Sequence, residues 1–569
     1  MIGELPPALV LVLGALLVPL LPGKLRSVYL LALPVLSFLH LLGLPRDLVL
    51  EWRAFDFTLS VVRIDRLSFV FGVIFHIAAF LGVIYAVHVK ESLEHVTALV
   101  YVGAAIGALF AGDLVTLFVY WELTAISSVF LVWARRTPQA YRAGLRYLAI
   151  QVASGVILLA GVILHYRHAR SIAFGALGLQ PGDPGTYLIF IAFGIKCAFP
   201  LLHNWLQDAY PEATVTGTVF LSAFTTKLAV YALARGFPGT EILIPIGAAM
   251  TLFPIFYAVI ENDLRRVLAY SLNNQLGFMV VGIGIGTPLA LNGTCSHAFA
   301  HILYKALLFM SMGAVLFRAG KINGSELGGL YKSMPWTTLF CIIGAASISS
   351  FPLTSGFVSK SMVIDGAAAG HHLLTWFALL FASAGVFHHS GIKIPFFAFF
   401  AHDSGIRCKE APGNMLLAMG LAAALCIGIG VYPQPLYGLL PYPVEGFAPY
   451  KATHVVTQLQ LLFFSGLAFT FLKKTGIYPP ELRSTNLDVD WFYRRLPALA
   501  WRVAGAPVLA ALARGDEATR RGIPALVLGR PAPGEAVGRM PRSWGVSGVV
   551  VVVMLTLVAY LLFVFSRTR

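Results

Sequence analysis

The sequence predicts an all-α polytopic membrane protein, and three observations carry that prediction. Of its 569 residues, 58% are hydrophobic and only 12% are charged, whereas globular chains carry roughly 25% charged residues. The mean hydropathy is +0.79. The apolar residues gather in runs of about 17–25, the length that crosses a bilayer as a helix. The solvent that suits such a chain is lipid.

Counting these runs along the chain predicts about sixteen spans. The N-terminal stretch MIGELPPALVLVLGALLVPLLPGK has no positively charged start and no small-residue cleavage site, so we interpret it as a retained first span. The spans are centred roughly at residues 14, 35, 77, 103, 123, 153, 195, 224, 250, 275, 304, 349, 386, 422, 464 and 556.

The net charge of +15 indicates membrane topology rather than a nucleic-acid partner, because Lys and Arg lie in short loops and not on one amphipathic stripe. Loops that leave odd-numbered spans are richer in Lys and Arg, although the loop at 46–66 goes against the trend. We therefore expect a multi-pass protein of the cell (inner) membrane, with its N-terminus outside and the odd-to-even loops in the cytoplasm.

Two apolar segments share an unusual design. One holds Lys196 before Pro200, and the other holds Pro352 before Lys360. A lysine beside a helix break, repeated five spans later, predicts two five-span inverted repeats of the kind that build transporters. The predicted organisation is N-terminal helices at 1–64, a core at 65–475 with repeats at about 95–235 and 241–400, a cytoplasmic connector at 476–545, and a final span at 546–569.

The predicted connector is rich in arginine and then in proline and glycine. Its first part, LDVDWFYRRLPALAWRVAGAPVLAALARGDEATRR, is partly amphipathic. It fits a helix that lies on the membrane surface, followed by a flexible tail. Its prolines argue against one continuous rod.

Titratable side chains lie inside the apolar spans, where each charge costs about 2.5–3.5 kcal/mol at a helix centre. Lipid-facing helices could not carry so many, so we expect these side chains to face the bundle interior, to meet one another and to be hydrated. The candidate proton-translocation residues are Glu122, Lys196, Lys227, His297, His301, Lys305, Lys360 and Lys393.

Other interpretations stay open for part of this set. Lys360 and Lys393 lie near predicted span ends and could reach the headgroups. His297, His301 and Lys305 share one helix face, and a His pair four residues apart is half of a zinc site, but no carboxylate lies near in sequence. A proton relay and hydrogen-bonded core histidines are the alternatives. We expect no bound metal or cofactor, and the five scattered cysteines read as small apolar residues.

Proton handling is the chemistry that suits this set. Loss of solvation disfavours a charged lysine, and a nearby glutamate favours it. Moving the glutamate toward or away from the lysine therefore switches the lysine between holding and releasing a proton. A proline break supplies a hinge and backbone groups that can hold water. This explains why Lys196 and Pro200 are kept together.

Several motifs, in order over roughly residues 65–475, carry a resemblance. They are FVYWEL with Glu122, KCAFPLLHNWLQDAYPEA with Lys196, ENDLRRVLAYSLNNQLGFM, HAFAHILYKALLFMSMGAV and FPLTSGFVSK. By them the chain resembles the antiporter-like proton-translocating subunit family. That family includes the three antiporter-like subunits of respiratory complex I, the A-type and D-type subunits of Mrp-type cation/proton antiporters, and membrane-bound hydrogenase counterparts. GIKIPFFAFF and LDVDWFYRR lean toward the branch of the D-type Mrp subunits.

The resemblance implies about fourteen core helices, with interrupted helices in two inverted five-helix repeats, extra C-terminal helices and a hydrated axis across the middle of the membrane. It also implies roles: Glu122 as the essential glutamate of the fifth helix, Lys196 as its partner, Lys227 as the bridging lysine, His301 with Lys305 as the central relay, and Lys360 as the terminal position.

Three functions remain in contention. The first is a proton-translocating subunit of a multi-subunit membrane complex, with Mrp-like exchange of Na⁺, or K⁺, for protons. The second is the proton-pumping membrane subunit of a complex I-like NADH:quinone oxidoreductase or a membrane-bound hydrogenase, in which case any enzymatic chemistry lies on partner subunits. The third is a membrane anchor of a cytoplasmic enzyme, for example in inorganic-carbon uptake. A scaffold has no need for buried charge, which disfavours the third.

Overall fold

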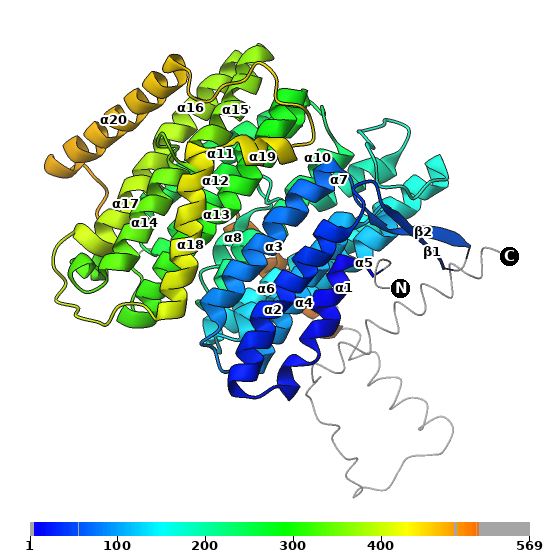
Figure 1. Ribbon diagram of the computed structural model, residues 1–569, viewed down its shortest axis with the longest axis horizontal. Coiled ribbons are helices and arrows are strands. Elements are labelled where there is room, and N and C mark those ends of the chain that lie inside the picture. The colour runs from blue at the N-terminus through cyan, green and yellow to red at the C-terminus, as the bar shows by residue number, and fades with distance from the viewer. Residues whose placement is uncertain (1–4, 55, 483–485, 508, 511–569) are drawn as a thin grey trace, which may run out of the picture. The chain divides into compact units, whose positions relative to one another are not determined.

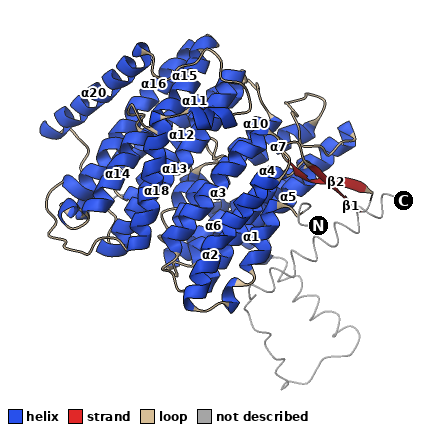
Figure 2. Cartoon of the chain, in the orientation of Figure 1, coloured by secondary structure: helices blue, strands red, loops and turns tan. Residues whose placement is uncertain are grey.

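The structure is a computed structural model that describes residues 5–54, 56–482, 486–507 and 509–510. It confirms a mostly helical membrane protein (Figures 1 and 2). Within these residues, eleven helices are long and apolar enough to cross a membrane, and three shorter apolar helices accompany them. The predicted final span at 546–569 lies outside the described residues.

Two helices and a hairpin precede the core. The hairpin falls in the segment 46–66, where a plain loop was expected. Its strands pair antiparallel, and Asp65 then caps the next helix by accepting from the Ser68 backbone N–H at 2.8 Å. The elements are α1 Pro7–Ala15, η2 Val18–Leu20, α2 Gly23–Gly43, β1 Val49–Ala54, β2 Phe57–Arg63 and α3 Arg66–Ala86.

The next elements fall into two sets of similar design, blue to cyan and then green in Figure 1. The first set is α4 Ser92–Phe110, α5 Leu114–Trp133, α6 Pro138–Ala169, α7 Pro184–Lys196, α8 Asn204–Ala209, α9 Gly217–Ala223 and α10 Thr225–Gly236. The second set is α11 Leu243–Ile260, α12 Leu264–Ile285, α13 Pro288–Ala319, η3 Gly324–Glu326, η4 Leu330–Lys332, α14 Pro335–Ile348, α15 Ser355–Ala369, α16 Leu373–Val386, η5 Phe387–Ile392, α17 Lys393–Pro395 and η6 Phe396–Phe400.

The helix starts of the two sets match in detail. Asp113 caps α5 and Asp263 caps α12, and each residue also forms an isolated β-bridge to a later loop. Thr137 and Thr287 cap α6 and α13, two helices of 32 residues that both begin with proline. A side chain at the N-cap accepts a backbone N–H that the helix itself leaves unpaired. The same local chemistry therefore starts the corresponding helices of both sets.

The two predicted helix breaks also match. Between α7 and α8, Ala198 and Leu201 have left-handed φ angles of 62° and 69°. Between α14 and α15, Ser350 and Leu353 have φ angles of 58° and 67°. In each break a proline stands between the two left-handed residues, in the sequences AFPL and SFPL. Proline removes a backbone donor, so the helix ends on one side and begins again on the other.

The chain continues through α18 Gly413–Val431, α19 Gln434–Leu439 and α20 Ala452–Lys474. Residues 478–482 and 486–490, here called the C-terminal strap, follow α20 and contact the core. A second unit begins at residue 491, and the part of it that the structure describes holds most of α21 Asp490–Ala500, and η7 Trp501–Gly505. These helices occupy the segment where the sequence predicts an amphipathic surface helix.

Candidate proton-translocation site

The α7–α8 break places Lys196 at the end of α7, facing α5. Lys196 is fully buried. Its Nζ donates to the Trp121 backbone carbonyl and to the Thr124 hydroxyl, both at 2.9 Å, and lies 4.2 Å from the centre of the Trp121 ring. An ammonium has three donors, so two are used by α5 and one remains.

Glu122 lies between these two partners along α5, so Glu122 and Lys196 belong to the same region of the structure. Its Oε1 is buried and has no hydrogen-bond partner in the described part of the chain. The carboxylate lies over Gly155 of α6 and fills the space that a β-carbon there would need. Next to Glu122, Trp121 Nε1 donates to the Ser154 hydroxyl at 3.1 Å, which fixes α5 against α6.

Lys227 is held by the break between α9 and α10. The Thr225 N–H donates to the Tyr101 hydroxyl at 2.9 Å instead of continuing the helix. The Ser222 carbonyl at the break then accepts from Lys227 Nζ at 2.6 Å, and the Thr226 hydroxyl accepts at 3.3 Å. Lys227 is fully buried, so its charge is satisfied by backbone and hydroxyl oxygens rather than by lipid headgroups.

His297, His301 and Lys305 are fully buried along α13. His297 Nδ1 lies 3.2 Å from the Ser359 hydroxyl of α15. Both ring nitrogens of His301 and the Lys305 ammonium have no hydrogen-bond partner among the described residues. Because buried polar groups are almost always hydrogen-bonded, water is the partner that this region needs.

Lys360 lies on α15, just after the second break. It is 1% exposed. Its Nζ donates to the Ile348 carbonyl, at the end of α14, at 3.0 Å and lies 5.0 Å from the centre of the Phe278 ring. That ring packs against His297, with 5.8 Å between the ring centres. The first break therefore follows its lysine in the sequence, whereas the second break precedes its lysine.

Lys393 lies in a segment of π-helical turns, a geometry often found at functional sites. It is fully buried and donates to the Val259 and Glu261 carbonyls, both at 2.6 Å. Its Nζ lies 3.0 Å from Oε1 of Glu481 in the C-terminal strap. Lys360 and Lys393 are thus enclosed by the protein, not at a surface that would let them reach headgroups.

Sequence reasoning missed three groups near this set. His389 is buried four residues before Lys393, and its Nε2 has no partner in the described part of the chain. Glu481 and Asp488 come from the strap, and Asp488 accepts from Tyr270 at 3.0 Å and lies 3.1 Å from His203 Nε2. The HH dipeptide in the apolar run could have indicated His389. Nothing in the sequence places the strap carboxylates against the core.

The arrangement joins the two sets of helices. α10, which carries Lys227, contacts both α7 and α13. α13 in turn packs against α15, the helix of Lys360. Lysines, histidines and one glutamate therefore lie along contacting helices from α5 to α17, among hydroxyl and carbonyl oxygens. Such groups can bind, pass and release protons if water fills the gaps between them.

A comparison with family models matches residues 111–385 to the family described as NADH:quinone oxidoreductase/Mrp antiporter, TM. Among curated proteins, Hydrogenase-4 component B of Escherichia coli (strain K12) is 26% identical over 423 residues, which cover 66% of this chain and 63% of that protein. This chain therefore spans less than two thirds of that relative's length.

Two further relatives are similar over a shorter part of this chain. The D-type subunit of the Na(+)/H(+) antiporter of Alkalihalophilus pseudofirmus is 29% identical over 351 residues, or 58% of this chain and 71% of that protein. The M-type subunit of the NADH-quinone oxidoreductase of Pseudomonas aeruginosa is 28% identical over 374 residues, or 60% of this chain and 72% of that protein.

Two solved structures have a similar fold. The Mrp complex from Dietzia sp. DQ12-45-1b matches with a TM-score of 0.66 and 20% identity, over 82% of this chain and 95% of that one. The membrane-bound sulfane sulfur reductase, an archaeal respiratory membrane complex, matches with a TM-score of 0.69 and 21% identity, over 98% of this chain and 100% of that one.

Proposed function

We propose that this chain, of which residues 111–385 match the NADH:quinone oxidoreductase/Mrp antiporter family, is a proton-translocating subunit of a multi-subunit membrane complex. The proposed activity is Mrp-like exchange of a monovalent cation, Na⁺ first, for protons. The similarity to a D-type antiporter subunit supports this choice. Its partners are the other membrane subunits of the complex, and its place is the cell membrane with the N-terminus outside.

One observation carries the proposal: Glu122 and seven basic residues lie within the helical core, and seven of the eight are at most 1% exposed. Each such group costs several kcal/mol in lipid, so a chain that keeps eight of them in contacting helices uses them. A scaffold would be more stable with apolar side chains at these positions.

The first transfer takes place between Glu122 and Lys196. With two Lys196 donors held by α5, the third can point to the unpartnered Glu122 Oε1 or to a water beside it. A proton that reaches Glu122 neutralises the carboxylate, and the ammonium then loses its nearest negative charge. Lys196 is thereby primed to release its own proton toward the next basic group.

Lys227 is the next basic group along the contacting helices, and the unpartnered His301 and Lys305 follow on α13. Each step requires only that one nitrogen gives a proton to water and another accepts it. His297 and Lys360, which both lie beside the Phe278 ring, then continue the path to α15. Lys393, with Glu481 as counter-ion, forms a second terminus beyond His389.

A second candidate function is the proton-pumping subunit of a redox complex. The fold match that covers nearly the whole of this chain comes from a respiratory reductase complex, and this favours the alternative. In that case flavin and iron–sulfur groups lie on partner subunits, and this chain still only moves protons.

Purification of the intact complex and its reconstitution into proteoliposomes with a pH-sensitive dye distinguishes the two. Proton movement driven by a Na⁺ gradient, and absent with choline, supports the antiporter. Proton movement that requires an electron donor and acceptor, with flavin or iron–sulfur absorbance in the preparation, supports the redox complex. A complex that moves protons under neither condition contradicts both.

A further inference from the structure

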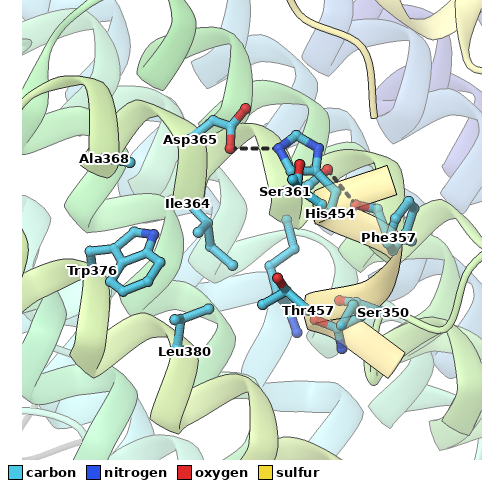
Figure 3. Close-up of a pocket in the computed structure, with 13 residues that line it drawn as sticks. Ser350, Phe357, Ser361, Ile364, Asp365, Ala368, Trp376, Leu380, His454 and Thr457 are labelled. Atoms are coloured by element: carbon cyan, nitrogen blue, oxygen red, sulfur yellow. Dashed lines mark hydrogen bonds and ion pairs between the residues drawn. The ribbon is translucent and has the colours of Figure 1, made fainter. Parts of the chain in front are cut away.

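A cavity of about 240 Å³ opens beside Lys360, between α15, α16 and α20 (Figure 3). Most of its wall is apolar, but polar side chains line it at two levels. Lys360 and Gln458 lie near the second helix break, whereas Asp365 and His454 lie one turn or more away from it on α15 and α20. The cavity is large enough for several waters, each of which occupies about 30 Å³ in the liquid.

Its inner end is built on the carbonyls that the break releases. Lys360 Nζ donates to the Ile348 carbonyl at 3.0 Å, and Gln458 Nε2 donates to the Ser349 carbonyl at 2.9 Å. Two side chains from different helices therefore bind the carbonyls at the end of α14, at the inner end of the cavity. Lys360 has donors left over, and the cavity is where they can meet water.

Its outer part is crossed by an ion pair. His454 Nε2 lies 2.9 Å from Asp365 Oδ1, and His454 Nδ1 lies 3.2 Å from the Pro449 carbonyl. Both ring nitrogens face acceptors, so only the doubly protonated ring donates to both. No titratable side chain of α16 lines the cavity, so Lys360, Asp365 and His454 are the titratable groups that face it among the described residues.

We propose that this cavity is an aqueous vestibule through which Lys360 exchanges protons with one side of the membrane, and that the Asp365–His454 ion pair is its gate. The proposal rests on the proposed function. It places proton release on the outer side, because the loops next to the cavity, at 370–372 and 432–451, leave even-numbered spans.

The gating step is a single proton transfer. The Lys360 ammonium gives a proton to water in the cavity, and that water gives one to the Asp365 carboxylate, so one N–H bond breaks and one O–H bond forms. Neutral Asp365 no longer attracts the His454 imidazolium, and the pair opens. Loss of the proton to the outer solution restores the carboxylate and closes the pair again.

Cysteine accessibility tests the vestibule without requiring proton flux. Thr457 lines the cavity, and its neighbour Val456 is 52% exposed on the outer face of α20. In full-length chains carrying Cys408→Ser, because Cys408 is the native thiol that is not fully buried, we expect Thr457→Cys to react with a membrane-impermeant charged thiol reagent in right-side-out vesicles. We expect Val456→Cys, which faces lipid, to stay unlabelled. Equal labelling of the two variants, or labelling only in inverted vesicles, would overturn the vestibule.

The gate is tested by adding Asp365→Asn to Thr457→Cys. Loss of the ion pair should raise the labelling rate severalfold, and labelling of Thr457→Cys should block proton flux in the reconstituted complex. An unchanged labelling rate would overturn the gate. Labelling as expected in a complex whose flux continues undiminished would remove the cavity from the proton path while leaving the proposed function intact.

Discussion

The carboxylate of Glu122 on α5 occupies the space that a side chain at Gly155 on α6 would fill. Residue 155 must therefore be glycine, because any larger side chain on α6 would collide with the Glu122 carboxylate of α5. The contact with Gly155 therefore helps to set where the Glu122 carboxylate lies.

Gly155→Ala should consequently displace the Glu122 carboxylate while leaving all titratable groups in the chain. A misplacement of about 1 Å costs up to about 100-fold in rate, so we expect proton flux in proteoliposomes to fall by about 10- to 100-fold. The control is Gly428→Ala in α18, where a β-carbon would meet nothing within 4 Å. Similar flux in the two variants would show that the carboxylate position is unimportant.

The hydroxyl of Thr124 is one of two acceptors for the Lys196 ammonium. Thr124→Val keeps the shape and removes that acceptor, and a hydrogen bond to a charged group contributes about 1.5–3 kcal/mol. We expect flux to fall about tenfold or more, since 1.4 kcal/mol corresponds to about tenfold in rate. Thr124→Ser restores the hydroxyl and should restore flux. Normal flux in the valine variant would mean that Thr124 does not position Lys196.

The strap carboxylate of Glu481 is the only acidic partner within 4.0 Å of the Lys393 ammonium among the described residues. Glu481→Gln leaves a buried cation without a counter-ion, and breaking a buried pair costs about 3–5 kcal/mol. The thermal unfolding midpoint of the purified complex should fall by several degrees. Asp403→Asn, which removes an exposed acid paired with Lys332 and Arg407, should leave it unchanged. Equal midpoints in the two variants would contradict a structural role for the strap.

The contribution of Asp65, the residue just before α3, to the stability of the fold depends on pH. Burial alone raises the pKa of Asp65, but the hydrogen bond and charge of Arg235 outweigh it, so the pKa lies below its ordinary value. Because the pKa of Asp65 is lower in the folded than in the unfolded protein, ionised Asp65 stabilises the fold at pH values above the ordinary pKa of aspartate. This stabilisation is lost as the pH falls through the lowered pKa of the folded protein.

Asp65→Asn keeps the helix cap and removes the pairing with Arg235. The unfolding midpoint of the wild type should therefore exceed that of the variant at pH 6 to 7, and the difference should shrink as the pH falls below the ordinary Asp range. Differential scanning fluorimetry across this range measures it. A difference that grows with acidification would contradict the pairing.

Both helix breaks were predicted correctly from the sequence, because a proline and a lysine close together in an apolar run do not suit an unbroken helix that faces lipid. Glu122, Lys196 and Lys227 were also found in this way, since a charge in the middle of a span must face protein. The roles of these residues stay predictions. The hairpin at 49–63 was missed, because its alternation is weak beside the surrounding charges.

Sequence reasoning could not find Glu481 beside Lys393, or His454 in the cavity beside Lys360, for a physical reason. Glu481 contacts a lysine 88 residues earlier in the chain, and His454 lines the same cavity as a lysine 94 residues earlier. Helical periodicity relates only residues within a few turns, so it says nothing of such contacts. Only the packing of α20 and the strap against the core reveals them.

The most direct test of proton transfer through this chain is proton flux in the reconstituted complex that carries Glu122→Gln, a change that keeps the shape of the side chain and removes its titration. We predict that the complex assembles with all its subunits and that its proton flux falls to the level of empty liposomes. Flux equal to that of the wild type would contradict a proton path that begins at Glu122.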